Sequence, residues 1–97
     1  MFERSKDRYL TRGVDSEIPL DIQIFLWELV DKLPKERDYL QVFSLTAQNG
    51  KQVIKHSSEQ PKHEREYIID VLIKAVTAKV YIIDDGDHCT MLLAEEY

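Results

Sequence analysis

The sequence predicts an α+β fold in which one amphipathic helix packs on a mostly antiparallel sheet of five or six strands, including two hairpins. Three observations predict it. Apolar residues recur at helical spacing between Pro19 and Leu33, Asn49-Gly50 separates two strand-like runs, and two apolar runs flank Asp85-Gly86. A helix repeats its buried face every 3.6 residues, whereas a strand repeats its buried face every two residues.

Length and composition indicate one cytoplasmic domain spanning residues 1–97, with residues 1–7 flexible. The 97 residues are 43% hydrophobic and 32% charged, and the net charge of −5 argues against a dedicated nucleic-acid binder. Cys89 is the single cysteine, which excludes an internal disulfide and a multi-cysteine zinc module and suits a reducing cytoplasm. No secretory signal or membrane-spanning apolar run is present.

The helix is expected from Pro19 to Leu33. Pro19 suits a first-turn position, the carboxylates and hydroxyl of residues 15–17 supply capping groups, and Pro34 ends the helix. Before it, residues 9–14 form a short candidate strand.

A hairpin is expected from residues 39–47 and 52–57, because Asn-Gly is the strongest short hairpin signal. In this register Leu45 faces Ile54 and Phe43 faces His56. Polar residues 57–65, which include Pro61, then predict a loop. Residues 64–76 suit a strand by their β-branched content and a helix by their spacing, and we favour a strand over 67–73.

The closing hairpin is predicted to turn at Asp85-Gly86, so that Ile83 faces His88 and Ile82 faces Cys89. One face is then entirely apolar, which favours this register. That face comprises Ala78, Val80, Ile82, Cys89, Met91 and Leu93. The whole predicted core comprises Ile22, Phe25, Leu26, Leu29, Phe43, Leu45, Ile54, Ile69, Val80, Ile82, Met91 and Leu93.

Four segments resemble a known family. They are Tyr-Leu-Thr-Arg-Gly-Val (9–14), Glu-Ile-Pro-Leu (17–20), Asp-Tyr-Leu-Gln-Val-Phe (38–43) and the closing stretch from Ile83 to Tyr97. These segments resemble domain-of-unknown-function family 960, small uncharacterised cytoplasmic proteins of low-GC Gram-positive bacteria. The resemblance implies a single cytoplasmic domain and no activity or site residue.

The acidic turn offers a candidate metal site at Asp85, Asp87 and His88. In the predicted register Asp84 and Asp87 lie opposite each other, and a divalent cation would relieve their repulsion. Carboxylate oxygens with one imidazole suit Mg²⁺, Mn²⁺ or Zn²⁺. The simpler interpretation is that Asp and Gly are ordinary turn residues whose charges are solvated.

No catalytic constellation appears, and the sequence implies no cofactor. Neighbouring strand residues point to opposite faces, so His88 cannot readily activate Cys89, which we expect to be buried. His56 and His63 match no metal motif. The basic N-terminal lead, which includes Arg4, Lys6, Arg8 and Arg12, could contact nucleic acid, although a frayed, solvated terminus is the better explanation.

The helix carries a second apolar stripe at Leu20, Ile24 and Trp27, nearly opposite its core face. Either the chain itself covers this stripe, or a homodimer or partner protein does. The leading hypothesis is therefore a non-catalytic protein-interaction module that binds a partner or a second copy here. A metal-binding protein or metal-assisted enzyme at residues 84–88 is the alternative, followed by weak nucleic-acid contact.

Overall fold

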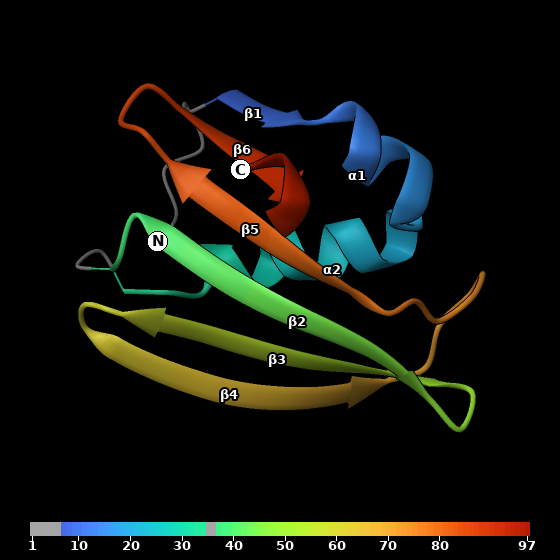
Figure 1. Ribbon diagram of the computed structural model, residues 1–97. Helices are drawn as coiled ribbons and strands as arrows, with labels where there is room; N and C mark the ends of the chain where they lie inside the picture. The colour runs from blue at the N-terminus through green and yellow to red at the C-terminus, as the bar shows by residue number, and fades with distance from the viewer. Residues whose placement is uncertain (1–6, 35–36) are drawn as a thin grey trace.

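A computed structural model describes residues 7–34 and 37–97 and confirms the predicted fold class. Six strands form one sheet in the order β1-β6-β5-β2-β3-β4, and helix α2 lies across one face (Figure 1). The elements are β1 (Asp7–Leu10), α1 (Arg12–Glu17), α2 (Leu20–Asp31), β2 (Leu40–Gln48), β3 (Lys51–Glu59), β4 (Lys62–Ile69), β5 (Ala78–Asp84), β6 (His88–Leu93) and the 3-10 turn η1 (Ala94–Glu96). Neighbouring strands are antiparallel, except that β1 runs parallel to β6.

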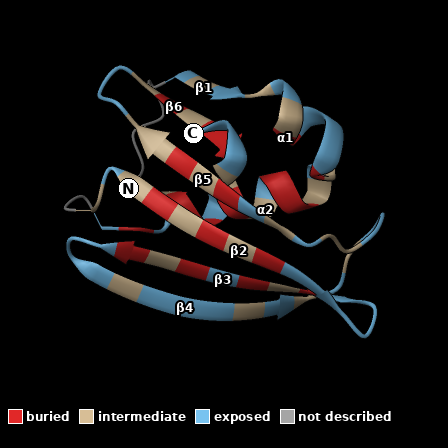
Figure 2. Ribbon diagram, in the orientation of Figure 1, coloured by how far each residue is buried: buried red, intermediate tan, exposed pale blue. Residues whose placement is uncertain are grey.

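The core lies between α2 and the covered face of the sheet. Figure 2 shows buried residues alternating with intermediate or exposed ones along β2, β3 and β5, as expected for strands with one wet face. Ten of the twelve predicted core residues are buried, while Phe25 and Ile69 pack half-buried at its margin. None of the helices in the described ranges is long and apolar enough to cross a bilayer.

The N-terminal prediction is partly wrong. The strand predicted over 9–14 ends at Leu10, and Arg12–Glu17 form helix α1, where the Thr11 hydroxyl accepts a hydrogen bond from the Val14 N–H. Residues 15–17 therefore belong to α1 and do not cap α2, whose N-cap residue is Pro19. The predicted flexible segment 1–7 lies outside the described residues, apart from Asp7, which begins β1.

The hairpin of β2 and β3 has the predicted register, with Leu45 opposite Ile54 and Phe43 opposite His56. Asn49 and Gly50 at its turn both have positive φ, at 53° and 78°. Two consecutive positive φ values define the turn that matches the twist of a hairpin, which explains why Asn-Gly specifies it.

Replacing Gly50 should destabilise this hairpin. Gly50→Ala places a side chain at φ 78°, and the left-handed conformation costs an L-residue about 1–2 kcal/mol. The free energy of unfolding, measured by urea denaturation, should fall by about that amount. Lys51→Ala, at the neighbouring exposed position, should change it by less than about 0.5 kcal/mol. Equal effects of the two substitutions would contradict the conformational explanation.

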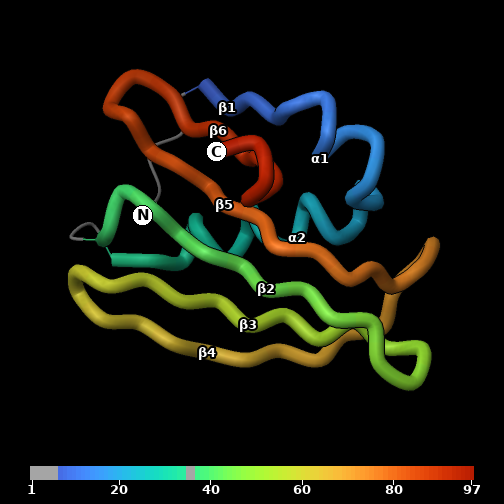
Figure 3. Tube along the Cα trace, viewed as in Figure 1, coloured from blue at the N-terminus to red at the C-terminus, as the bar shows by residue number. Residues whose placement is uncertain are grey.

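The predicted loop over residues 57–65 is wrong. β3 continues to Glu59 and β4 begins at Lys62, so that only Gln60 and Pro61, joined by a cis peptide bond, separate the strands. The strand predicted over 67–73 ends at Ile69, and neither helix nor strand forms from residue 70 to residue 77. This irregular segment, which we call the β4–β5 loop, projects beyond the end of the sheet (Figure 3).

The closing hairpin forms in a register two residues from the predicted one. Ile82 pairs with Met91 and Asp84 pairs with Cys89, and the Asp85 N–H donates to the His88 carbonyl at 3.1 Å. The turn therefore lies at Gly86 and Asp87, with Gly86 at φ 100°. A slip of two keeps every side chain on its face, so the predicted apolar face is correct although the facing pairs are wrong.

Candidate functional site

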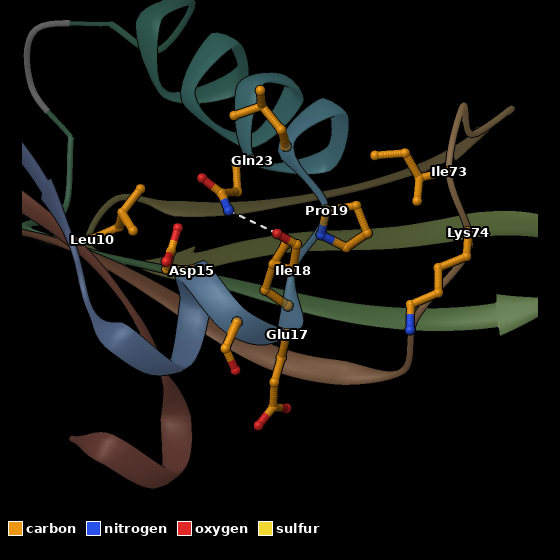
Figure 4. A pocket seen from close by; sticks show the side chains of 10 residues that line it. Leu10, Asp15, Glu17, Ile18, Pro19, Gln23, Ile73 and Lys74 are labelled. Atoms are coloured by element: carbon orange, nitrogen blue, oxygen red, sulfur yellow. Dashed lines mark hydrogen bonds between the residues drawn. The ribbon is translucent and has the colours of Figure 1, made fainter.

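An open groove lies where α1 turns into α2. Its volume is about 470 Å³. Figure 4 shows Leu10 at one end of the groove, Ile73 and Lys74 at the other, and Pro19 between them. The corner is fixed from inside, because the buried Gln23 side chain donates a hydrogen bond to the Ile18 carbonyl at 2.7 Å. The groove is therefore a preformed feature of the fold.

The predicted second apolar stripe of α2 is only partly covered by the chain, and its first residue, Leu20, lines this groove. Leu20 is 64% exposed and Ile24, one turn later, is 50% exposed. Trp27 is half-buried, and the Arg8 guanidinium lies 4.7 Å from its ring centre. Arg8 also forms an ion pair with Asp31 at the end of α2. The chain itself thus partly covers Trp27, whereas Leu20 and Ile24 stay exposed.

The β4–β5 loop extends the exposed apolar surface. Leu72 is 89% exposed, and Ile73, also largely exposed, lines the groove. The loop is attached to α2, because the Leu72 N–H donates to Asp21 Oδ2 at 2.8 Å. It is also attached to the sheet through the fully buried Gln52, whose amide exchanges hydrogen bonds of 2.8 and 3.0 Å with the Val76 backbone. Sequence reasoning missed this arrangement, since no local pattern links residues 21, 52 and 76.

The rim of the groove is predominantly acidic. Asp15 and Glu17 line it, and Lys74 is its one basic residue among the described residues. Apolar side chains with a rim on which one charge sign predominates favour a partner of the opposite sign, because charge complementarity steers association and excludes wrong partners. The groove thus combines exposed apolar area with a negative rim.

The acidic turn does not have the predicted arrangement. Asp84 lies opposite Cys89 and not opposite Asp87, and it accepts hydrogen bonds from Arg37 at 3.3 Å and from the Gly86 N–H at 2.9 Å. The facing Asp84/Asp87 pair that motivated a cation is therefore absent. Asp85 Oδ2 and His88 Nε2 lie 3.1 Å apart, while Asp87 is exposed.

Metal binding at Asp85, Asp87 and His88 stays a prediction. Within residues 7–34 and 37–97 no group of three His, Cys, Asp or Glu side chains is close enough to hold an ion. Cys89 is buried, as predicted, and His88 is only partly exposed. Of the basic lead, Arg4 and Lys6 lie outside the described residues.

A buried polar cluster around His56 was not predicted. His56 is 1% exposed, stacks on Phe43 with ring centres 4.4 Å apart, and contacts the His63 ring at 4.6 Å. Its Nε2 lies 2.7 Å from Gln41 Oε1, while the Gln41 amide donates to the Asp38 carbonyl at 2.9 Å. Because Oε1 can only accept, Nε2 carries the proton and Nδ1 is a bare acceptor. Burial, and secondly the charge of His63, lowers the pKa of His56 to about 4.

The sequence signal for this cluster is weak but present. Gln52, His56 and Ser58 alternate with more exposed residues along β3, as inward-facing strand residues do. The polarity of residues 57–65, together with Pro61, led to the prediction that this part of the chain is a loop. Buried polar side chains need partners, and in this fold the partners come from other elements: Gln41 for His56, and Val76 for Gln52.

The fold and its surfaces define a small α+β protein with one helix-covered sheet, an acidic-rimmed apolar groove and a buried histidine cluster. A family model for staphylococcal proteins of unknown function, DUF960, matches residues 7–96. The chain is also similar to a solved structure, a protein of unknown function from Enterococcus faecalis. The identity is 30% and the TM-score 0.77, over 100% of this chain and 98% of that chain. No curated protein matches.

This chain belongs to the DUF960 family. Both comparisons lead to Gram-positive bacteria, and neither describes an activity.

Proposed function

We propose that this protein is a non-catalytic cytoplasmic interaction module. It binds a partner protein with the groove between α1 and α2, which we call the α2 groove, and with the exposed side of α2 that carries Leu20 and Ile24. One observation carries the proposal: Leu20 and Ile24, one helical turn apart, are 64% and 50% exposed, and Leu20 also lines the groove. When a partner covers exposed apolar surface of this kind, the burial stabilises the complex by about 25 cal/mol per Å² of apolar area removed from water. A cytoplasmic location suits the single thiol.

The surface favours a partner segment that presents apolar side chains flanked by Lys or Arg. Leu20, Ile24 and Ile73 supply the apolar contacts, and Asp15 and Glu17 supply the negative rim. A second copy of this chain fits less well, because the chain carries 18 acidic and 13 basic residues and its own groove rim is acidic. A homodimer is therefore an outcome that the experiment must separate from a different partner.

Photo-crosslinking tests the proposal. A photoreactive residue at position 24 should give a discrete adduct in the host cell, and the crosslinked segment should carry apolar residues beside Lys or Arg. Leu20→Glu should abolish this adduct while leaving the fold intact, because Leu20 is exposed. Ile68→Glu is the matched control, since Ile68 on β4 is 66% exposed but lies outside the groove.

Three results would count against the proposal. The first is the absence of any adduct at position 24, and the second is an adduct that survives Leu20→Glu. The third is an adduct with a second copy of the chain, which would replace the proposed partner by a homodimer. Sedimentation of the purified protein would then show a dimer that Leu20→Glu dissociates and Ile68→Glu does not.

A further inference from the structure

A second cavity lies at the other end of α2, against the turn between β3 and β4. Its volume is about 140 Å³. The residues that line it are Leu33, Pro34, Arg37, Ser58, Pro61, Lys62 and His63. Its walls come from three parts of the fold: the segment after α2, the chain that leads into β2, and the β3–β4 hairpin.

The charge of this cavity opposes that of the whole chain. Arg37, Lys62 and His63 line it, and none of its lining residues in the described part of the chain is acidic. The chain carries a net charge of −5, so a cavity with basic and hydroxyl lining differs from its surroundings. Arg37 is held in place by Asp84, at 3.3 Å, and its side chain is only 12% exposed. The Asp84 carboxylate offsets the charge of Arg37, so Lys62 and His63 are the lining residues that can attract an anion.

Two imidazole nitrogens behind the cavity lack hydrogen-bond partners. His63 Nε2 and His56 Nδ1 are both shielded from solvent without a partner among the described residues, and the two rings are in contact. A buried polar atom without a partner costs about 1–3 kcal/mol. Such atoms in native structures therefore point to a bound molecule or to a functional constraint. His56 is buried and His63 lines the cavity, so the two contacting imidazole rings reach from the protein interior to the cavity.

We propose that this cavity binds a small oxyanion, such as inorganic phosphate or a short carboxylate, between Lys62 and His63. The basic side chains supply charge and donors, and Leu33, Pro34 and Pro61 form an apolar wall, while the Ser58 hydroxyl donates to the Pro61 carbonyl at 3.3 Å and so fixes the turn beside them. Pockets for drug-sized ligands measure roughly 300–1,000 Å³. The cavity's 140 Å³ therefore restricts the ligand to a few non-hydrogen atoms and excludes a nucleotide.

A bound anion also accounts for the histidine pair. Negative charge beside His63 favours the protonated imidazole, in which both nitrogens donate. One N–H can then serve the anion and the other a buried acceptor. This site is independent of the α2 groove, and its failure would leave the proposed function untouched.

An NMR titration tests the inference. Inorganic phosphate and acetate are added separately to the ¹⁵N-labelled protein at neutral pH and constant ionic strength. We expect saturable shifts of the Ser58, Lys62 and His63 amides with at least one of the two anions. Lys62→Gln and His63→Gln should each weaken that binding about tenfold. Lys74→Gln, which removes the same charge at the α2 groove, should leave it unchanged.

Comparing the two anions shows whether the cavity is a phosphate site or a carboxylate site. Saturation by phosphate alone assigns a phosphate site, and saturation by acetate alone assigns a carboxylate site. The absence of saturable shifts with either anion up to high millimolar concentration would overturn the proposal, as would shifts that Lys62→Gln and Lys74→Gln weaken equally. Should His63→Gln fail to fold, Lys62→Gln decides the outcome, because Lys62 is exposed.

Discussion

Acidification from pH 7 to pH 4 should lower the free energy of unfolding by about 2–3 kcal/mol through His56 alone. Burial, and secondly His63, lowers the pKa of His56 from the usual 6.5 to about 4 in the folded protein. Between these two values the unfolded chain binds a proton that the folded chain does not. The stability that the neutral imidazole contributes is therefore complete above pH 6.5 and is lost as the pH falls toward 4.

Urea denaturation at half-unit steps of pH measures this effect. His56→Gln removes the titrating group and should flatten the decline between pH 6.5 and pH 4, even if it lowers stability at pH 7. His88→Gln, at the half-exposed hairpin tip, should keep the wild-type decline because His56 is still present. The carboxylates of Asp38 and Glu96 add a decline of their own only at the acid end of this window. Hydrogen bonds, from the Leu40 N–H to Asp38 and from the Thr11 hydroxyl to Glu96 first, lower their pKa values in the folded protein from the ordinary 3.8 and 4.5. The stability they contribute is therefore lost as the pH falls past these ordinary values, and the two variants are compared above pH 5. A decline that persists in His56→Gln would refute the assignment.

The sequence predicts the parts of the fold that local chemistry determines. Asn49-Gly50 admits one tight turn, so the register of β2 and β3 follows from it. Asp85-Gly86-Asp87 offers a single glycine with acidic neighbours on both sides, and the alternation of apolar residues is satisfied equally by registers two residues apart. The structure selects the register in which Gly86 takes a positive φ as the first turn residue.

Elements whose polar residues face inward are not predicted by local sequence patterns. His56 and Ser58 are buried on β3 because Gln41 and the Pro61 carbonyl lie within hydrogen-bond distance of their side chains. Those partners are far apart in the chain or belong to an unexpected turn. Helix α1 is missed for a similar reason, since the Glu96 carboxylate accepts from Thr11 and from the Gly13 N–H at the start of the helix.

The sequence predicts only part of the exposed apolar surface around α2, because the rest depends on contacts from other segments. Periodicity places Leu20, Ile24 and Trp27 on one stripe of α2, and the structure leaves the first two exposed. Periodicity cannot show that Arg8 of a separate strand lies over Trp27. Nor can it show that the loop containing Leu72 and Ile73 is attached next to the helix. Both facts depend on contacts between segments far apart in the sequence.

Gln52→Leu should detach the β4–β5 loop from the sheet and lower the free energy of unfolding by about 2–4 kcal/mol. Gln52 is completely buried, and its amide group bonds the Val76 N–H at 2.8 Å and the Val76 carbonyl at 3.0 Å. The same Nε2 lies 3.2 Å from the carbonyls of Thr46 and Val53. Leucine has nearly the same size but no polar atom, so these groups would lose their partner while the core stays filled.

Two measurements separate the two expected effects. Hydrogen exchange at the Val76 and Leu72 amides reports detachment of the loop, and urea denaturation reports the loss of stability. In Gln52→Leu, protection should fall at Val76 more than at Ile54 or Val80 in the core, because the loop is released before the sheet unfolds. The groove should then lose its Ile73 wall, and the crosslink at position 24 should weaken although Leu20 and Ile24 are unchanged. Gln48→Leu, at an exposed position of β2, should preserve protection and crosslinking. If Gln52→Leu kept full protection at Val76, the loop would have to be held by Asp21 and Thr77, which bond the N–H groups of Leu72 and Ala47.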